Sequence, residues 1–205
     1  GVFGNKSKIG HYEKGNNEVQ HSLSWADADN DGDMDVYCGM TFHKNIFFLN
    51  TGTALEQIEE DNIILSEDEP THCVNWIDYD NDGDMDLYTV DALFENLGSM
   101  EFKKHIIIDE KYDSDSVWSS SRVWGDLDND GDLDLFVSVE HNHLLGDPDE
   151  PISAHPYNLL YLNEGNGQFT NVFNHTLTLH DGHTAEIFDH DNDGDLDVLS
   201  FGNAW

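Results

Sequence analysis

Short stretches of alternating apolar and polar residues recur along the chain and predict β-strands. They come in pairs, and each pair encloses an acidic segment of nine residues. The paired stretches cover residues 23–25 and 34–37, 74–77 and 85–88, 123–124 and 133–137, and 185–188 and 196–199. Alternation with β-branched and aromatic residues is typical of strands with one buried face. The pattern therefore predicts four β-hairpins, and we find no stretch that predicts a long helix.

Further strands are predicted after these hairpins. They cover residues 46–50, 101–103 and 159–163, and the last leads through a Gly- and Asn-rich turn at 164–168 into another predicted strand. A large apolar residue stands two positions before each acidic segment: Trp25, Trp76, Trp124 and Ile187. We expect the three tryptophan side chains to pack in the core between neighbouring sheets.

The acidic segments share one pattern, Asp-x-Asp-Asn-Asp-Gly-Asp-x-Asp. It occupies residues 27–35, 78–86, 126–134 and 189–197. Five carboxylates within nine residues repel one another unless a cation compensates them. Calcium takes about six to eight oxygen ligands in a flexible cage. The pattern therefore predicts about four bound Ca²⁺ ions, which we expect to be structural.

The spacing assigns a role to each position of the pattern. Side chains at positions 1, 3 and 5 converge if the backbone coils tightly, and glycine at position 6 allows a turn that a β-carbon would obstruct. Position 7 usually contributes its backbone carbonyl, and position 9 closes the cage. An EF-hand would instead close with Glu at position 12, which these segments do not share. The candidate calcium ligands are Asp27, Asp29, Asp31, Asp33, Asp35, Asp78, Asp80, Asp82, Asp84, Asp86, Asp126, Asp128, Asp130, Asp132, Asp134, Asp189, Asp191, Asp193, Asp195 and Asp197.

The acidic segments recur at the spacing of propeller blades. Their first aspartates are 51, 48 and 63 residues apart, and a repeat of about 40–50 residues with about four strands is typical of a β-propeller. A tryptophan precedes three of the segments, and Leu-Tyr-Leu-Asn-Glu-Gly-Asn-Gly-Gln-Phe stands at 160–169. In these features the chain resembles the FG-GAP/VCBS repeats of integrin-α-like β-propellers.

The resemblance implies an all-β fold of four-stranded blades with a calcium loop between the first and second strand of each blade. It covers nearly all of residues 1–205, taken as a single β-propeller domain or propeller segment. Such propellers commonly have seven or eight blades, whereas this chain has four calcium loops. Two interpretations stay open. The chain is a segment of a larger propeller, or residues 1–18 supply the outer strands of the fourth unit and close a four-bladed ring.

The charge of the chain excludes some partners. Eight basic and 43 acidic residues give a net charge of −35, and the four motifs hold 20 of the acids. Such a surface repels nucleic acid and anionic membranes, and no apolar run is long enough to span a bilayer. Exposed acidic loops suit millimolar extracellular calcium, so we expect a secreted or cell-surface protein. Cys38 and Cys73 form a disulfide or stay as thiols.

Candidate ligand-binding residues are expected on the propeller face opposite the calcium loops. Histidines stand six residues before three of the loops, and the third unit carries a long insertion at 140–157. Long loops are often functional. The candidates from these two features are His21, His72, His183, His141, His143, His155 and Tyr157.

Several interpretations of this face stay open. The residues are ordinary polar loop residues, or they form a surface that binds carbohydrate or protein in adhesion or recognition. A carbohydrate-active enzyme of polysaccharide-lyase type would use His and Tyr as base and acid, but the single arginine, Arg122, makes a uronate-binding cluster hard to assemble. A purely architectural module of a surface assembly is the last alternative. We expect recognition rather than catalysis.

Overall fold

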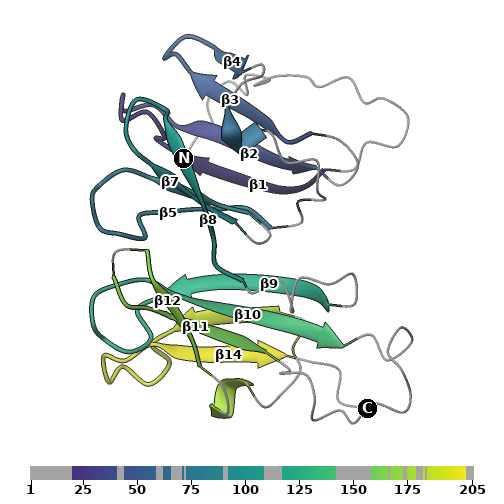
Figure 1. Ribbon diagram of the computed structural model, residues 1–205, viewed down its shortest axis with the longest axis vertical. Helices are drawn as coiled ribbons and strands as arrows, with labels where there is room; N and C mark the ends of the chain where they lie inside the picture. The colour runs from purple at the N-terminus through teal and green to yellow at the C-terminus, as the bar shows by residue number, and fades with distance from the viewer. Residues whose placement is uncertain are drawn as a thin grey trace, which may run out of the picture. The chain divides into compact units, whose positions relative to one another are not determined.

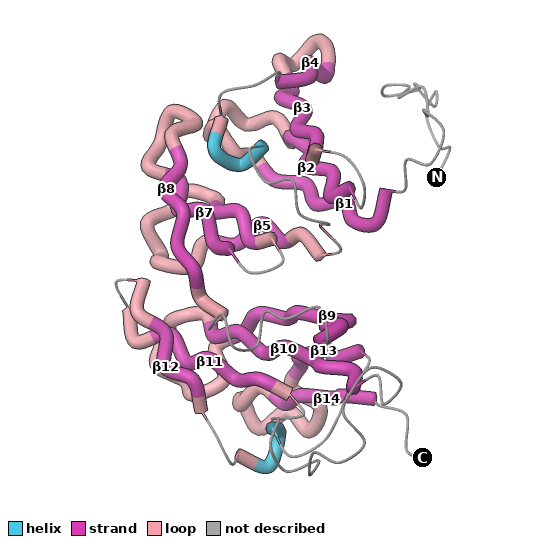
Figure 2. The backbone as a smooth tube through the Cα atoms, turned by 45° about the vertical axis from the view of Figure 1, so that its right-hand side comes forward, coloured by secondary structure: helices cyan, strands magenta, loops and turns pink. Residues whose placement is uncertain are grey.

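The computed structural model describes residues 20–40, 44–58, 62–65, 71, 73–89, 92–108, 117–141, 158–165, 167–172, 175–178, 182 and 184–201. Within these residues the chain is all-β, with two short 3-10 turns as its helical elements. Figure 2 shows these turns in cyan between the strands. The chain divides into two compact units, residues 1–77 with 83–105 and residues 78–82 with 106–205.

The first unit contains two antiparallel sheets of four strands (Figure 1). One has the order β1-β2-β3-β4, formed by β1 (Gln20–Ala26), β2 (Asp35–Met40), β3 (Ile46–Asn50) and β4 (Leu55–Ile58). The turn η1 (Ile63–Leu65) follows it. The other has the order β5-β6-β7-β8, formed by β5 (Asn75–Ile77), β6 (Asp86–Tyr88), β7 (Ala92–Asn96) and β8 (Phe102–Ile106).

The second unit repeats this plan. A four-stranded sheet has the order β12-β11-β10-β9, formed by β9 (Val117–Gly125), β10 (Asp134–His141), β11 (Leu159–Asn163) and β12 (Phe169–Asn171). After η4 (Thr176–Thr178) comes a two-stranded sheet of β13 (Thr184–Phe188) and β14 (Asp197–Phe201). Two strands are therefore described for the fourth repeat, and the number of blades stays a prediction.

All four predicted hairpins are confirmed, with an acidic loop between the first and second strand of each repeat. Their registers are equivalent, because the residue before the loop pairs with the aspartate at position 9 each time. These pairs are Ala26↔Asp35, Ile77↔Asp86, Gly125↔Asp134 and Phe188↔Asp197. The second strand of every repeat thus begins at the position-9 aspartate. This pairing holds the aspartate's carboxylate beside the loop.

Aromatic side chains fill the core between the two sheets of the first unit. The Trp76 ring meets Tyr37 at 6.4 Å and Phe47 at 6.0 Å between centroids, and all three belong to one buried cluster. The predicted core position of Trp76 is confirmed, since its side chain is 8% exposed. The same prediction is wrong for Trp25, which is 45% exposed. Its position packs against a preceding sheet, and no described residues supply one for Trp25.

Cys38 and Cys73 do not form a disulfide with each other in the structure. Cys38 is buried in β2, and Cys73 is half-buried, with its Sγ donating to Asn75 Oδ1 at 3.4 Å. The described helical turns are too short to cross a membrane.

Candidate metal centres

The four acidic loops share one backbone conformation. The asparagine at position 4 has φ between 59° and 64°, and the glycine at position 6 has φ between 94° and 100°. Asparagine and glycine are the residues that adopt positive φ at least cost. An added β-carbon on Gly32 would meet nothing within 4 Å. The glycine is therefore required for its backbone angle, as the sequence predicted, because no other part of the chain lies where its β-carbon would be.

The carboxylate at position 1 organises the backbone of the first, third and fourth loops. Asp27 accepts hydrogen bonds from the backbone N–H of Asp31 at 3.0 Å and of Gly32 at 2.9 Å. Asp126 accepts the equivalent bonds from Asp130 and Gly131 at 3.0 and 3.1 Å. The fourth loop repeats them at Asp189. The backbone thus coils around this side chain, as a calcium loop requires.

In the first three loops the carboxylate at position 9 is the buried end of the site. Asp35 is 0% exposed and accepts the backbone N–H of Ala28 at 2.9 Å and of Asn50 at 2.7 Å. Asp134, also 0% exposed, accepts the N–H of Leu127 at 2.8 Å and of Asn163 at 2.9 Å. These bonds hold each carboxylate in one orientation.

Burial makes the negative charge at position 9 unfavourable when no cation is bound. It raises the pKa of the Asp134 carboxyl from 3.8 to about 6, although the two backbone hydrogen bonds favour the charged form. The pKa of Asp35 is raised for the same reason. The pKa values of Asp29 and Asp128 are raised by burial and by the neighbouring Asp31 and Asp130. A bound cation would relieve these penalties.

Carboxylate oxygens converge in each loop, within 4.8 Å of one another. In the first three loops they come from positions 1, 3 and 9, and in the fourth from positions 1, 3 and 5. The groups are Asp27, Asp29 and Asp35; Asp78, Asp80 and Asp86; Asp126, Asp128 and Asp134; and Asp189, Asp191 and Asp193. Hard oxygen ligands in this arrangement suit calcium or another hard cation. Several groups of the chain can therefore hold a metal ion.

The side chain at position 7 has a different role in the structure. Asn30 Nδ2, at position 4 of the first loop, donates to Asp84 Oδ1 at position 7 of the second loop, at 2.6 Å. Asn81 Nδ2 donates to Asp132 Oδ1 at 3.1 Å, and Asn129 Nδ2 to Asp195 Oδ1 at 3.0 Å. The same donor and acceptor positions thus link successive loops, which fits the expectation that position 7 faces a cation with its backbone carbonyl.

Asparagines at the end of the third strand brace the loops, and the sequence analysis missed this role. Asn50, Asn96 and Asn163 each donate their backbone N–H to the position-9 carboxylate. Each side-chain oxygen accepts the N–H of a glycine two residues later. Asn96 Nδ2 also donates to the carbonyls of Ala28 at 2.9 Å and Met85 at 3.1 Å. The sequence feature that indicates this role is the Asn-x-Gly pattern, which recurs at the end of the third strand in these three repeats.

Replacing Asn96 by alanine is expected to destabilise the protein by about 2–3 kcal/mol, because buried carbonyls lose their donor. Asn50→Ala is the matched control, since Asn50 is half-buried and its Nδ2 donates to one carbonyl, Met34 O at 3.2 Å, among the hydrogen bonds described. We expect it to cost less than about 1 kcal/mol. Urea unfolding in calcium at pH 7 measures both. Equal costs would show that the buried amide does not brace the loop.

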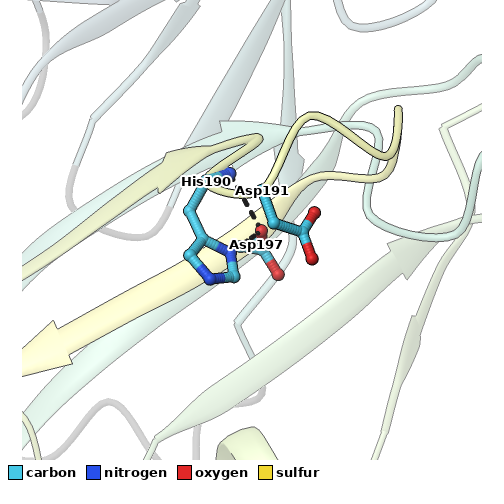
Figure 3. Close-up of side chains that lie close together, drawn as sticks. All are labelled: His190, Asp191 and Asp197. Carbon is cyan, nitrogen blue, oxygen red and sulfur yellow. Dashed lines mark hydrogen bonds and ion pairs between the residues drawn. The ribbon is translucent and has the colours of Figure 1, made fainter.

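The fourth loop differs at position 2, where His190 stands in place of Ala28, Tyr79 or Leu127. Figure 3 shows both the backbone nitrogen and the ring of His190 directed at Asp197. The N–H lies 3.0 Å and Nδ1 2.6 Å from Asp197 Oδ2. The hydrogen bond with Asp197 and its charge raise the pKa of His190 and lower that of Asp197. The imidazole of His190 is thus hydrogen-bonded to the carboxylate at position 9 of this loop.

His190→Leu, which restores the residue of the third loop, is expected to reduce proton release when calcium binds at pH 7. In the calcium-free protein His190 holds its proton to a higher pH than a free histidine. Its ion pair with Asp197 is fully formed below the ordinary pKa of 6.5 and is lost as pH rises through the raised pKa. A calcium ion at Asp197 would expel this proton. Calorimetry in buffers of different ionisation enthalpy counts the protons, and an unchanged count in His190→Leu would refute the coupling.

The predicted ligand-binding residues stay untested. His21 and His141 belong to β1 and β10, but their side chains are not among the described ones. The remaining candidates lie outside the described residues: His72, His143, His155, Tyr157 and His183.

The repeated hairpins and their acidic loops place the chain in a class of all-β repeat proteins with candidate metal sites between the first two strands of each repeat. The family model described as FG-GAP-like repeat matches residues 27–89 and 146–200, more than half of the chain. The chain therefore belongs to the FG-GAP repeat family, as the resemblance indicated. No curated protein matches it.

Proposed function

We propose that the chain is an extracellular, calcium-binding β-propeller module, or a segment of one, in which calcium is structural. The convergence of three carboxylates in every loop carries this proposal, together with the burial of Asp35, Asp86 and Asp134 at position 9. Three buried charges of one sign, each with an oxygen within 4.8 Å of oxygens from two further carboxylates, favour a divalent hard cation. FG-GAP repeats often bind calcium, which supports the choice of ion.

The role we propose for the module is adhesion or recognition. FG-GAP repeats usually occur in extracellular proteins that bind protein ligands, and exposed acidic loops bind calcium at the millimolar levels found outside cells. The net charge of −35 disfavours nucleic acid and anionic membrane surfaces as partners. Carbohydrate or protein ligands remain the proposed partners, and the insertion at 140–157 supplies the proposed contact residues.

Calcium titration of the purified chain tests the proposal. Isothermal titration calorimetry is expected to give about four calcium ions per chain, and about three after Asp134→Asn removes one position-9 ligand. Magnesium is expected to bind far more weakly, because it demands an octahedral site at about 2.0–2.1 Å and keeps its waters. No heat of calcium binding, or a stoichiometry unchanged by Asp134→Asn, would contradict the proposed sites.

The recognition role needs a separate measurement. A glycan array and a screen against extracellular matrix proteins, each run in millimolar calcium and in chelator, are expected to show calcium-dependent binding. His141→Ala combined with Tyr157→Ala is expected to weaken that binding without changing the calcium stoichiometry. Binding that survives both substitutions would move the ligand site away from the insertion.

A further inference from the structure

The fourth acidic loop brings together a second group of possible metal ligands. Besides the converging carboxylates of Asp189, Asp191 and Asp193, it places a ring nitrogen of His190 within 4.8 Å of oxygens from Asp191 and Asp197 (Figure 3). The other groups of this kind among the described residues consist of carboxylates alone. We call His190, Asp191 and Asp197 the mixed group, because it offers one nitrogen and two oxygen ligands.

The position of the imidazole follows from the backbone that the loops share. The N–H at position 2 donates to the carboxylate at position 9, and the bond is 2.9 Å long for Ala28, 2.8 Å for Leu127 and 3.0 Å for His190. Ala28 is buried and Leu127 packs against the core, and neither side chain can bind an ion. His190 brings an imidazole to this position instead. Its ring meets that of Phe188 edge-on, at 6.5 Å between centroids, which restricts its orientation.

Asp197 does not belong to the group that its counterparts form. Asp35 and Asp134 are fully buried and converge with the carboxylates at positions 1 and 3 of their loops. The side chain of Asp197 is 44% exposed, and its Oδ2 lies 2.6 Å from His190 Nδ1. The ligands of the fourth loop are therefore divided between a carboxylate group at positions 1, 3 and 5 and the mixed group, and the two groups share Asp191.

The two groups of the fourth loop suit different ions. Calcium and magnesium take oxygen ligands, whereas imidazole suits transition-metal ions such as zinc, copper and nickel. Zinc binds histidine nitrogen and aspartate oxygen equally well, at about 2.0–2.2 Å. One neutral imidazole and two carboxylates also balance the charge of a divalent ion. The mixed group therefore matches a transition-metal ion better than it matches calcium.

The mixed group can adjust to the size of such an ion. Two ligands of one tetrahedral zinc ion lie roughly 3.3 Å apart at these bond lengths. The distance of 2.6 Å between His190 Nδ1 and Asp197 Oδ2 therefore has to lengthen only slightly. Both side chains are exposed enough to allow this shift, at 61% and 44%. Their exposure also admits water, which commonly completes the coordination of zinc held by three protein ligands.

We propose that the fourth loop holds a divalent transition-metal ion, with His190, Asp191 and Asp197 as its protein ligands and water completing the coordination. Calcium binds in the first three loops, whose groups contain no nitrogen ligand. Because Asp191 belongs to both groups of the fourth loop, the transition-metal ion and calcium compete there. This site extends beyond the structural calcium proposed above, and its failure would leave the calcium sites of the first three loops untouched.

Zinc titration of the calcium-saturated chain at pH 7 tests this site. Calorimetry is expected to show one tightly bound zinc ion per chain, and dialysis with elemental analysis is expected to show bound calcium falling from about four ions to about three. His190→Leu is expected to weaken zinc binding more than about tenfold, because loss of a residue that merely supports a ligand already costs that much. His175→Leu, which removes an exposed histidine outside the loops, is the matched control and is expected to have no effect. Circular dichroism verifies that the variants fold.

Cobalt gives an independent measurement of the same site. The visible absorption of Co²⁺ bound to a nitrogen ligand is expected in the wild type and in His175→Leu, but not in His190→Leu. Asp197→Asn is expected to weaken the binding of both metals, since it removes an oxygen ligand while the imidazole stays.

The outcomes separate this site from the calcium sites. A wild-type chain that binds calcium but no zinc overturns the transition-metal site, and so does zinc binding that His190→Leu leaves unchanged. Equal losses in His190→Leu and His175→Leu would also overturn it, because they would show adventitious binding to surface histidines. Zinc binding that depends on His190, in a chain that binds no calcium, would support this site and contradict the structural calcium sites.

Discussion

Removing calcium at pH 7 is expected to lower the melting temperature of the protein by about 20–40 °C, or to unfold it at 25 °C. Calcium at about 100 times its dissociation constant stabilises a single site by about 2.7 kcal/mol. Four such sites together contribute on the order of 10 kcal/mol, which is comparable to the entire stability of a typical domain. For a chain of this size about 1 kcal/mol corresponds to roughly 2–4 °C. Differential scanning calorimetry with calcium and with chelator measures the shift.

Two controls separate calcium binding from simple screening of charge. The net charge of −35 means that any added salt stabilises the compact chain to some extent. Sodium chloride at matched ionic strength is expected to recover only a small part of the lost stability, and magnesium little more. A melting temperature that sodium chloride restores as well as calcium does would show that the loops need screening and not ligation.

Asp134→Asn is expected to destabilise the calcium-bound protein by about 3 kcal/mol and the calcium-free protein by less than about 1 kcal/mol. In calcium the variant loses one site, worth about 2.7 kcal/mol at saturation. In chelator two effects oppose each other. The amide leaves one backbone N–H without its acceptor, but it also removes a buried charge, whose cost is evident from the raised pKa of Asp134. Urea unfolding of the variant and the wild type in both conditions measures the difference.

Asp197→Asn is the matched control for this prediction. Asp197 stands at the same loop position, but its side chain is 44% exposed and it bonds with His190. Less burial means that its charge costs less in the absence of calcium, so we expect a smaller contrast between calcium and chelator. If both variants lost the same stability in both conditions, burial at position 9 would have no part in coupling calcium to folding.

The hairpins and loops were predictable because their signals are local. Alternating residues predicted the strands on both sides of each loop. The spacing of aspartates over nine residues predicted the convergence of positions 1, 3 and 9 in the first three loops and of positions 1, 3 and 5 in the fourth. The positive φ of Asn30 and Gly32 follows from residue types within the motif itself. Short-range chemistry therefore sufficed to place the candidate metal centres.

The supports of the loops could not be predicted in the same way. Asn50 lies 15 residues from Asp35, and Asn96 reaches the carbonyl of Ala28 across 68 residues. The Asn30–Asp84 link spans 54 residues. Pairing at such distances depends on how strands align and how sheets pack, which a sequence pattern does not specify. The exposure of Trp25 is a further example, because burial at that position requires a preceding sheet.

Each repeat that forms a link carries a donor asparagine for the loop that follows and an acceptor aspartate for the loop that precedes. The linking chemistry is therefore contained in the repeated sequence itself. A gene that duplicates one whole repeat in tandem would reproduce both halves of the contact without any compensating substitution. Loss of a whole repeat would bring together a donor and an acceptor that already match. Chains of this type can thus lengthen or shorten during evolution by complete repeats, while a partial duplication would separate a donor from its acceptor.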